Sequence, residues 1–461
     1  MSTLTLKPIK LKQPSSLIFL YLTSLSFTFL FVDTAGQSTL IDEFMLLAML
    51  PISAAGIFKH FFSIGRPAKL LVIYFFAVAL SSAVTLGSRN DIPWIAPALG
   101  IILDTKFLVF LGALLYLTNC SKYSADQIIL SICRAILLVG TVHSIFFLRD
   151  ILSNGMSISG IALTPSDIFG YIPIGLFSHK LYTAIISSIS FASAITLYLS
   201  KRRFIFILLS GFFLVILFLS SSLKELGVAA PVLLLFLRSL RTRGDRTSGA
   251  IRKLLFLTVI STPILAFIFG SALVQLVSSR ASTYLFEANT RAALHIKSAE
   301  IATDHFPLGS GAGTFSSQPS RSIYYSPLYY EYGMHEHYGA SEEYSSFLMD
   351  AGWPKFISEA GWLGGSAYFL AYLIAIAKLA ISFFRGTNPA NIFGLMLGSL
   401  IFFSAIGSAV FTGDMGLMVC ALMFTCLHLN RKQRTSRPIP IVAPHSERIP
   451  RNCVSIRKPM N

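Results

Sequence analysis

The stretch "KLLVIYFFAVALSSAVTLG" (residues 69–87) decides the fold class of this chain. Only its first residue, Lys69, is charged, and a helix needs about 20 mainly apolar residues to cross the hydrocarbon core of a membrane. Windows of this kind recur along the whole chain, which is 54% hydrophobic and 13% charged, with a mean hydropathy of +0.68. Soluble domains carry about 25% charged residues. The sequence therefore predicts an all-α, polytopic integral membrane protein and excludes a single soluble core.

Apolar windows of spanning length predict about twelve transmembrane helices. They fall at residues 16–34, 41–58, 69–87, 97–119, 127–148, 181–199, 203–221, 223–238, 253–277, 361–384, 391–411 and 415–430. The predicted organisation is an N-terminal transmembrane bundle of about nine spans over 1–277, a large periplasmic loop over 278–360, C-terminal transmembrane helices over 361–430 and a disordered basic cytoplasmic tail over 431–461. No internal repeat is found, which disfavours the transporter folds that are built from repeated halves.

Basic residues set the predicted orientation. By this topology about 26 of the 37 Lys and Arg residues lie on the side of the N-terminus, in clusters such as "KRR" (201–203), "RSLRTRGDR" (238–246) and "RKQR" (431–434). Positive loops stay in the cytoplasm, so both termini are expected there. The net charge of +16 is explained by this bias, and no nucleic-acid partner is predicted.

One polar stretch interrupts the apolar pattern, "TRAALHIKSAEIATDHFPLGSGAGTFSS" (290–317). Residues 291–305 contain no Pro or Gly and predict a helix, which Pro307 and the following glycines end in a tight turn. Arg291 and His295 are four residues apart and share one face of that helix. A guanidinium just above the lipid suits the phosphate of a membrane anchor. The glycines follow a helix instead of a strand, which disfavours a dinucleotide site.

The remainder of the loop, "SIYYSPLYYEYGMHEHYGASEEYSS" (322–346), is dense in Tyr. Tyr rings suit stacking on sugars, and they also anchor proteins at membrane interfaces, so both interpretations stay open. Trp94, Trp353 and Trp362 are expected at the outer interface. "HEH" (335–337) predicts no metal site, because residues two apart on a helix do not converge and no third ligand is fixed by spacing.

Three patches of this chain are similar to the O-antigen ligase and polymerase superfamily. They are "SSSLKELGVAAP" (220–231), "RAALHIKSAEIATDHFPLGSGAGTF" (291–315) and "DAGWPKFISEAGWLGG" (350–365). The first resembles the family's helix start, with Lys224 near the usual Arg; the second carries the loop Arg at Arg291 and the Pro-Leu-Gly-x-Gly turn; the third carries the Glu-x-Gly-x-x-Gly ending. Ligases have a His-Asn pair about nine residues before that Glu, where this chain has Asp350. This departure favours polymerase over ligase, and His335 or His337 is an alternative for the missing His.

The resemblance implies a multi-pass protein of the bacterial cytoplasmic (inner) membrane. It implies a glycosyltransferase that moves a glycan from an undecaprenyl diphosphate carrier onto an acceptor sugar hydroxyl outside that membrane. Such a reaction needs cations for the diphosphate charge and a base for the acceptor. Arg291 is expected to bind the diphosphate with Lys224, and Arg280 and Arg321 are weaker candidates. Asp350, His337 and Glu359 are candidates for the base or for the group that orients it. No metal or other cofactor is expected.

The implied partners are the lipid-linked glycan donor, a glycan acceptor, membrane lipids, and chain-length regulator and flippase proteins. A ligase that transfers finished polymer is one alternative. A flippase or transporter of lipid-linked sugars is the other, since such proteins also have about twelve spans with charged residues inside the membrane.

Overall fold

The computed structural model describes residues 22, 40–154, 175, 180–219, 290–386, 388–407, 411 and 413–435. Within these ranges every regular element is a helix, as the sequence predicted. The predicted spans at 223–238 and 253–277, and the span at 16–34 apart from Leu22, lie outside the described residues. Lys224 and Arg280, two of the predicted diphosphate ligands, lie outside them as well.

Six helical segments of the described ranges are long and apolar enough to cross a membrane. They are Leu47–Ile64, Arg66–Ser88, Ile95–Cys120, Ala125–Leu152, Leu181–Lys201 and Trp353–Arg385. They belong to α2 (Leu40–His60) with the 3-10 helix η1 (Phe61–Ile64), α3 (Arg66–Ser88), α4 (Ile95–Cys120), α5 (Ala125–Asn154), α6 (Lys180–Lys201) and α13 (Trp353–Arg385). Two shorter apolar helices are α7 (Ile205–Leu219) and α14 (Pro389–Ser404), and α15 (Asp414–Thr435) packs against α4 and α14. These helices indicate a membrane protein, and the count of about twelve spans stays a prediction.

One boundary of the predicted cytoplasmic tail is wrong. The tail was expected to begin at residue 431, but α15 continues to Thr435. Arg431 Nη1 donates a hydrogen bond to the carbonyl of Ser63, 3.0 Å away, and Gln433 Nε2 donates to Asp126 Oδ2 at 3.3 Å. These contacts to neighbouring helices explain why the helix extends beyond its apolar part.

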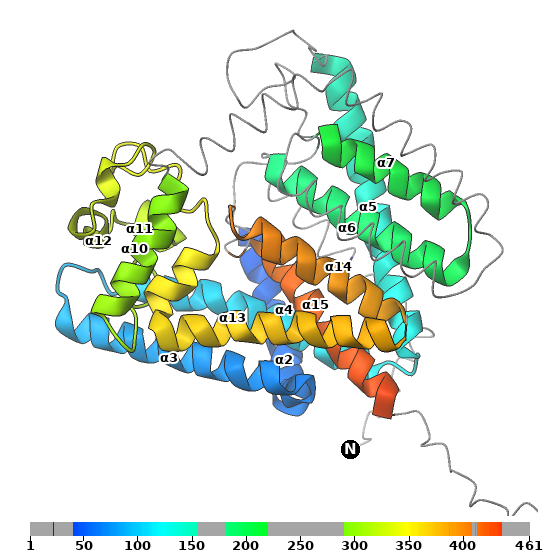
Figure 1. Cartoon of the computed structure of the whole chain (residues 1–461), viewed down its shortest axis with the longest axis horizontal. Helices are drawn as coiled ribbons and strands as arrows, with labels where there is room; N and C mark the ends of the chain where they lie inside the picture. Colours follow the sequence, from blue (N-terminus) through cyan, green and yellow to red (C-terminus); the bar gives the residue numbers. More distant parts are fainter. Residues whose placement is uncertain are drawn as a thin grey trace, which may run out of the picture.

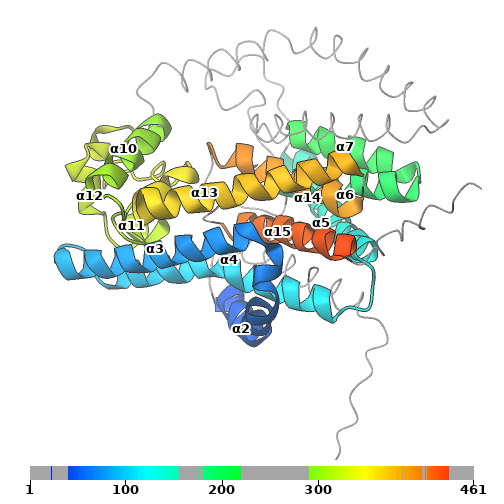
Figure 2. The same ribbon diagram turned by 60° about the horizontal axis from the view of Figure 1, so that its bottom comes forward.

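The helices form a bundle with a polar layer at one end. Figures 1 and 2 show α3 and α13 running side by side, with α4 next to α2 and α15, and with α5, α6 and α7 grouped together. Over the C-terminal end of α3 and the N-terminal end of α4 lie α10 (Thr290–Asp304), α11 (Gln318–Ser322), α12 (Pro327–Glu331) and η2 (Met334–Glu336); these helices and the loops that join them, residues 290–350, are here called the polar layer. The layer has its own small core, which includes Leu294, Phe315 and Tyr329. It therefore folds as a cap on the bundle.

Small residues bring α2 and α4 into close contact. A Cβ atom at Gly56 would lie 1.9 Å from the carbonyl oxygen of Gly112, and a Cβ at Gly112 would lie 2.4 Å from the carbonyl oxygen of Ser53. Such backbone contact is typical of helix pairs in lipid, where van der Waals packing replaces the hydrophobic driving force. The outward surface is apolar: Phe58 is 87% exposed and Phe76 66%. Both observations agree with a bundle surrounded by lipid tails.

α13 is a hairpin of two arms that meet at Gly361. Gly361 has φ 68° and ψ −172° inside the helix, and the ring of Phe356 stacks on Tyr368 with centroids 4.0 Å apart. The ring of Trp353 lies 6.0 Å from that of Tyr372, a separation that a straight helix rising 1.5 Å per residue does not allow. The arm 353–360 therefore folds back against the arm 362–385.

The hairpin corrects two expectations. Trp353 was expected at the outer interface, but only 7% of it is exposed and it packs in an aromatic cluster with Phe402 and Phe411. The last residues of the predicted loop, 353–360, form a buried helical arm of the bundle. Trp94, which is 72% exposed, lies at the start of α4 as expected for an interface residue. The sequence around Trp353, a Trp-Pro pair that follows a polar loop, does not show whether the Trp ring is buried or exposed.

Candidate functional site

Arg291 and Asp350, two of the residues selected from the sequence, form an ion pair. Arg291 lies in the first turn of α10, and its Nη2 donates to Asp350 Oδ2 at 2.5 Å. The two side chains are 21% and 29% exposed, so the pair is partly open to solvent. The guanidinium carbon of Arg291 also lies 5.9 Å from the ring centroid of Phe347. A cation and a carboxylate thus share one accessible position at the base of the polar layer.

The surrounding backbone fixes this pair at the end of α14. The amide of Asp350 donates to the carbonyl of Phe347 at 3.1 Å, and the amide of Gly352 donates to the carbonyl of Ala405 at 2.9 Å. One turn after Arg291, His295 Nε2 lies 3.1 Å from the carbonyl oxygen of Ile406, to which it donates. The predicted shared face of Arg291 and His295 is therefore confirmed, and it points toward the hairpin and α14.

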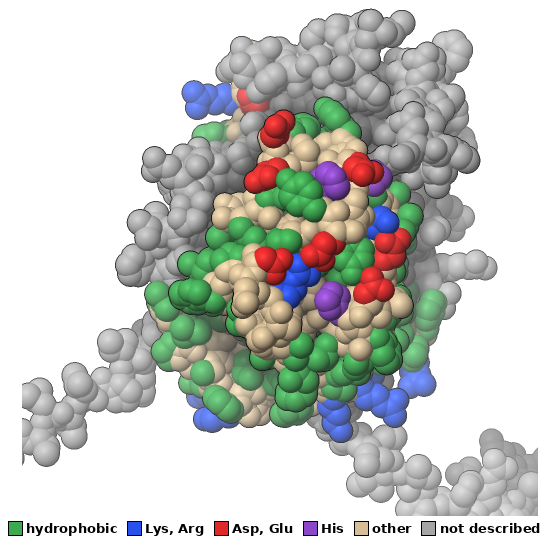
Figure 3. Space-filling view, turned by 90° about the vertical axis from the view of Figure 1, so that its left-hand side faces the viewer, with side chains coloured by type: hydrophobic (Ala, Val, Ile, Leu, Met, Phe, Trp, Pro, Cys, Tyr) green, Lys and Arg blue, Asp and Glu red, His purple; other side chains and the backbone are tan. Residues whose placement is uncertain are grey.

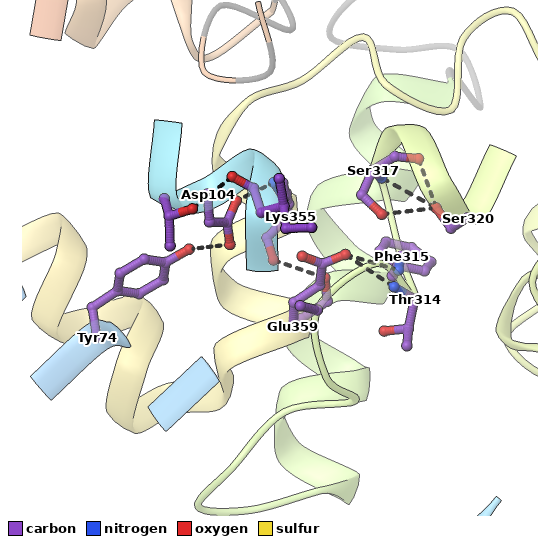
Figure 4. A network of polar contacts seen from close by, with 12 residues as sticks. Tyr74, Asp104, Thr314, Phe315, Ser317, Ser320, Lys355 and Glu359 are labelled. Atoms are coloured by element: carbon purple, nitrogen blue, oxygen red, sulfur yellow. Dashed lines mark hydrogen bonds and ion pairs between the residues drawn. The ribbon is translucent and has the colours of Figure 1, made fainter. Parts of the chain in front are cut away.

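A second ion pair is buried between α3, α4 and the short arm of α13. Lys355 Nζ bonds Asp104 Oδ1, and Asp104 Oδ2 accepts a hydrogen bond from the hydroxyl of Tyr74 at 2.9 Å. Figure 4 shows these side chains pointing toward one another from three helices. The side chains of Lys355 and Asp104 are only 4% and 6% exposed. Buried charges are tolerated when they are paired and hydrogen-bonded, as they are here.

Glu359 lies one turn after Lys355 and binds the turn formed by residues 307–315, here called the Gly-rich turn. Its Oε1 accepts hydrogen bonds from the amides of Thr314 at 3.0 Å and Phe315 at 3.3 Å, as drawn in Figure 4. The residue is 1% exposed. The structure thus separates this predicted base from Arg291 and Asp350. Its geometry favours a structural role at the turn over proton transfer to a substrate.

The backbone amides of the Gly-rich turn donate hydrogen bonds to other parts of the protein. Within residues 310–314, the amides of four of the five residues reach protein acceptors within hydrogen-bonding distance. The pairs are Ser310 N with Ser358 O at 2.8 Å, Gly311 N with Glu359 O at 3.1 Å, Ala312 N with Ser82 Oγ at 2.9 Å and Thr314 N with Glu359 Oε1 at 3.0 Å. Anion-binding loops aim such amides at a ligand. In this turn they join the loop to α3 and to the hairpin.

The turn and the elbow of the hairpin fit together only because both are built from glycine. A Cβ at Gly361 would lie 2.2 Å from the carbonyl carbon of Leu308, and its φ of 68° is one that L side chains rarely adopt. A Cβ at Gly309 would lie 2.2 Å from the carbonyl oxygen of Ser358. The Pro-Leu-Gly-x-Gly and Glu-x-Gly patches of the sequence are therefore two sides of one contact.

The other described site candidates have contacts of their own, and no ion pair between described residues joins them to Arg291 or Asp350. Arg321 is exposed near the end of α11. His337 follows η2, is half-buried, and its amide donates to the carbonyl of Met334 at 3.1 Å. His335 Nδ1 lies 3.2 Å from the carbonyl oxygen of Tyr329, to which it donates. Of the described candidates, the structure brings Arg291 and Asp350 together.

A solvent-facing ion cluster ties the polar layer to the end of α3. Arg89 Nη2 lies 2.7 Å from Asp91 Oδ2, and Arg89 Nη1 donates to Glu331 Oε2 at 3.0 Å. The hydrogen bond from Arg89 holds the pKa of Asp91 below its usual value. Figure 3 shows acidic, basic and His side chains gathered on this end of the molecule. The cluster joins α12 to the end of α3 at the surface of the protein, and the Gly-rich turn joins the polar layer to α3 in the interior.

Sequence reasoning missed the buried pair. Asp104 is a single acid within the predicted span at 97–119, and the residue patterns give no reason to pair it with Lys355 or Tyr74. A signal was present in the spacing: Lys355 and Glu359 are four residues apart and share a helix face. An acid in an apolar window requires a partner, which is a second signal.

No protein-family model matches the chain, and no curated protein matches it. Among the residues that the structure describes, no group of three or more His, Cys, Asp and Glu side chains is arranged to hold a metal ion.

Proposed function

We propose that this protein is a membrane glycosyltransferase that polymerises lipid-diphosphate-linked oligosaccharide units, of an O-antigen or an exopolysaccharide, on the periplasmic side of the inner membrane. The observation that carries the proposal is the partly exposed pair of Arg291 and Asp350 beside the membrane helices. It supplies a fixed cation and a carboxylate where a lipid-borne diphosphate emerges from the bilayer.

Each member of the pair has one task in the proposed reaction. The acceptor hydroxyl oxygen attacks the anomeric carbon of the donor glycan, and the bond from that carbon to the diphosphate oxygen breaks. Asp350 accepts the proton of the hydroxyl, while the lipid diphosphate departs with its charge. Arg291 stabilises that charge, exchanging part of its contact with Asp350 for the phosphate. A leaving group as good as a diphosphate needs little more than positioning and charge stabilisation.

The proposal includes a topology of about twelve spans with both termini in the cytoplasm and with residues 278–360 as the periplasmic loop. Support comes from the end of the bundle opposite the polar layer, where α2 turns into α3. A Cβ at Gly65 would lie 2.8 Å from Arg431 Nη1 and 3.5 Å from Lys378 Nζ, and Arg66 follows directly. Basic residues from three helices thus converge at the expected cytoplasmic end.

Reconstitution with lipid-linked repeat units tests the proposal. The wild-type protein in proteoliposomes is expected to convert such units into a ladder of longer lipid-linked chains. Arg291→Ala is expected to abolish the ladder while the protein still inserts and accumulates. Lys297→Ala is the matched control, because Lys297 lies on the same helix and pairs with Glu300 at 2.8 Å. A normal ladder from Arg291→Ala contradicts the assignment.

A ligase that transfers finished polymer would use the same pair. Glycan length in a deletion strain separates the two activities. Loss of long chains with single units retained indicates a polymerase, whereas polymer that accumulates on its lipid carrier indicates a ligase. The Asp at position 350, where ligases have His-Asn, favours the polymerase.

A flippase or transporter is the second candidate, and the buried pair of Lys355 and Asp104 is the observation that favours it. Ionisable groups inside a membrane protein often line a path for ions or substrate. The same proteoliposomes distinguish the two functions. Movement of the lipid-linked unit across the bilayer without chain growth supports the flippase, and growth with donor and acceptor on one face supports the transferase.

A further inference from the structure

Three aromatic rings form a cluster at the surface of the polar layer. The ring centroids of Tyr338 and Tyr344 are 5.6 Å apart, those of Tyr338 and Phe347 are 5.8 Å apart, and those of Tyr344 and Phe347 are 6.1 Å apart. Tyr338 is 76% exposed and Tyr344 is 44% exposed. Large rings normally bury their faces, so two exposed tyrosines in mutual contact leave an apolar surface uncovered. We call these three residues the aromatic platform.

The aromatic platform is held by the backbone. The amide of Phe347 donates to the carbonyl of Gly339 at 2.8 Å, which closes the loop between them. A Cβ at Gly339 would lie 2.1 Å from the Phe347 ring, so only glycine lets the ring lie against the chain here. The hydroxyl of Thr290 donates to the carbonyl of Tyr338, which fixes the platform to the first turn of α10. The rings are therefore set in place before any ligand arrives.

The aromatic platform is continuous with the Arg291 and Asp350 pair. The guanidinium of Arg291 lies over the inner ring, Phe347, at 5.9 Å from its centroid, and the same guanidinium bonds Asp350. Phe347 thus contacts both the guanidinium of the proposed reaction site and the exposed tyrosines. A chain that reacts at the pair would pass over the rings.

We propose that the aromatic platform binds a sugar ring of the glycan that reacts at the Arg291 and Asp350 pair, an inference that rests on the proposed function. The apolar face of a pyranose stacks on an aromatic ring, and the exposed tyrosine hydroxyls can bond the sugar hydroxyls at its edge. Exposed acids adjoin the platform at Glu342 and Glu343. Because like charges repel, the bound sugar is an uncharged or amino sugar instead of a uronic acid.

Binding and growth are measured separately on the full-length protein in nanodiscs. The probe is the repeat-unit oligosaccharide that mild acid releases from the cells' own lipid-linked pool, and saturation-transfer NMR reports its affinity. Tyr338→Ala and Tyr344→Ala are each expected to weaken binding about tenfold, a change of about 1.4 kcal/mol. Tyr338→Phe is expected to retain most of the affinity, because the ring face is kept. Trp94→Ala is the control, since Trp94 is equally exposed but lies at the start of α4.

The outcomes separate this inference from the proposed function. Unchanged affinity in both alanine variants, or no binding of the oligosaccharide to the wild type, overturns the platform even when chains grow in proteoliposomes. Binding that depends on the two tyrosines, without chain growth, supports the platform and overturns the polymerase. In the growth assay the alanine variants are expected to raise the KM for the glycan about tenfold and to leave kcat near its wild-type value.

Discussion

The protein contains two ion pairs of the same chemistry in opposite surroundings. Arg291 and Asp350 are 21% and 29% exposed, whereas Lys355 and Asp104 are 4% and 6% exposed. A partly exposed pair contributes about 0–1 kcal/mol to stability because water and salt screen it. A buried pair adds little net stability either, but removing one partner leaves an uncompensated charge inside the protein. The fold therefore depends on the pairing of Lys355 with Asp104, whereas the pairing of Arg291 with Asp350 contributes little to stability.

The largest expected effect comes from breaking the buried pair. Lys355→Met leaves Asp104 charged and unpaired, which is expected to destabilise the protein by about 3–5 kcal/mol. The yield of folded protein in membranes and the midpoint of thermal unfolding in detergent measure this. The double variant Lys355→Met with Asp104→Leu removes both charges and is expected to recover most of the loss. A double variant as unstable as the single one would show that packing, and not charge pairing, dominates at this position.

The exposed pair is expected to behave in the opposite way. Asp350→Asn keeps the size of the side chain but removes its charge and basicity, so chain growth is expected to fall by about 10²–10⁴-fold. The midpoint of thermal unfolding is expected to change little, because the stability of an exposed pair changes by about 1 kcal/mol or less. Initial rates of chain growth and thermal unfolding of the same preparation measure both effects. A variant that unfolds like Lys355→Met would remove the distinction between the two pairs.

Gly361 is the elbow of the α13 hairpin. It lets the arm that carries Lys355 fold back, and it packs against the Gly-rich turn. Gly361→Ala places a Cβ 2.2 Å from Leu308 and requires an alanine at φ 68°. A loss of about 1–3 kcal/mol in the free energy of unfolding is expected from backbone strain. Gly87→Ala is the matched control, because a Cβ there meets nothing within 4 Å. Equal stability of the two variants would mean that the elbow can relax.

Local features of the fold were predictable, and distant contacts were not. The helix after residue 290 was predicted from composition and from the Pro-Gly stop, because both act within a few residues. The partners of Lys355 could not be found in this way, since Asp104 lies 251 residues earlier in the chain. The fold-back at Gly361 depends on a positive φ, and the sequence "EAGWLGG" (359–365) contains several glycines that could adopt one. Trp353 was misplaced for the same reason, because a straight helix would have put it at the surface.

The residues of the candidate site could be predicted from the sequence, but their pairing could not. Arg291 and Asp350 could each be named from residue type and local pattern, but their pairing follows from how α10 packs on the hairpin. A carboxylate such as Glu359 could serve as a base by its chemistry. Its burial and its hydrogen bond to the amide of Thr314 favour a structural role, and both follow from the three-dimensional arrangement.

The smallest expected effect concerns the ion cluster of Arg89, Asp91 and Glu331, which is exposed like the proposed site but has only a fastening role. The bond from Arg89 keeps the pKa of Asp91 below its unfolded value, so its contribution to stability is full at neutral pH. The contribution is lost as the pH falls through the lowered pKa of the folded state, because the protonated acid no longer attracts Arg89. With Asp91 46% exposed, screening keeps the effect within about 1 kcal/mol. Thermal unfolding of the wild type and of Asp91→Asn is expected to differ slightly at pH 7 and to converge once the pH falls below the lowered pKa of Asp91; a difference that grows in acid would contradict this sign.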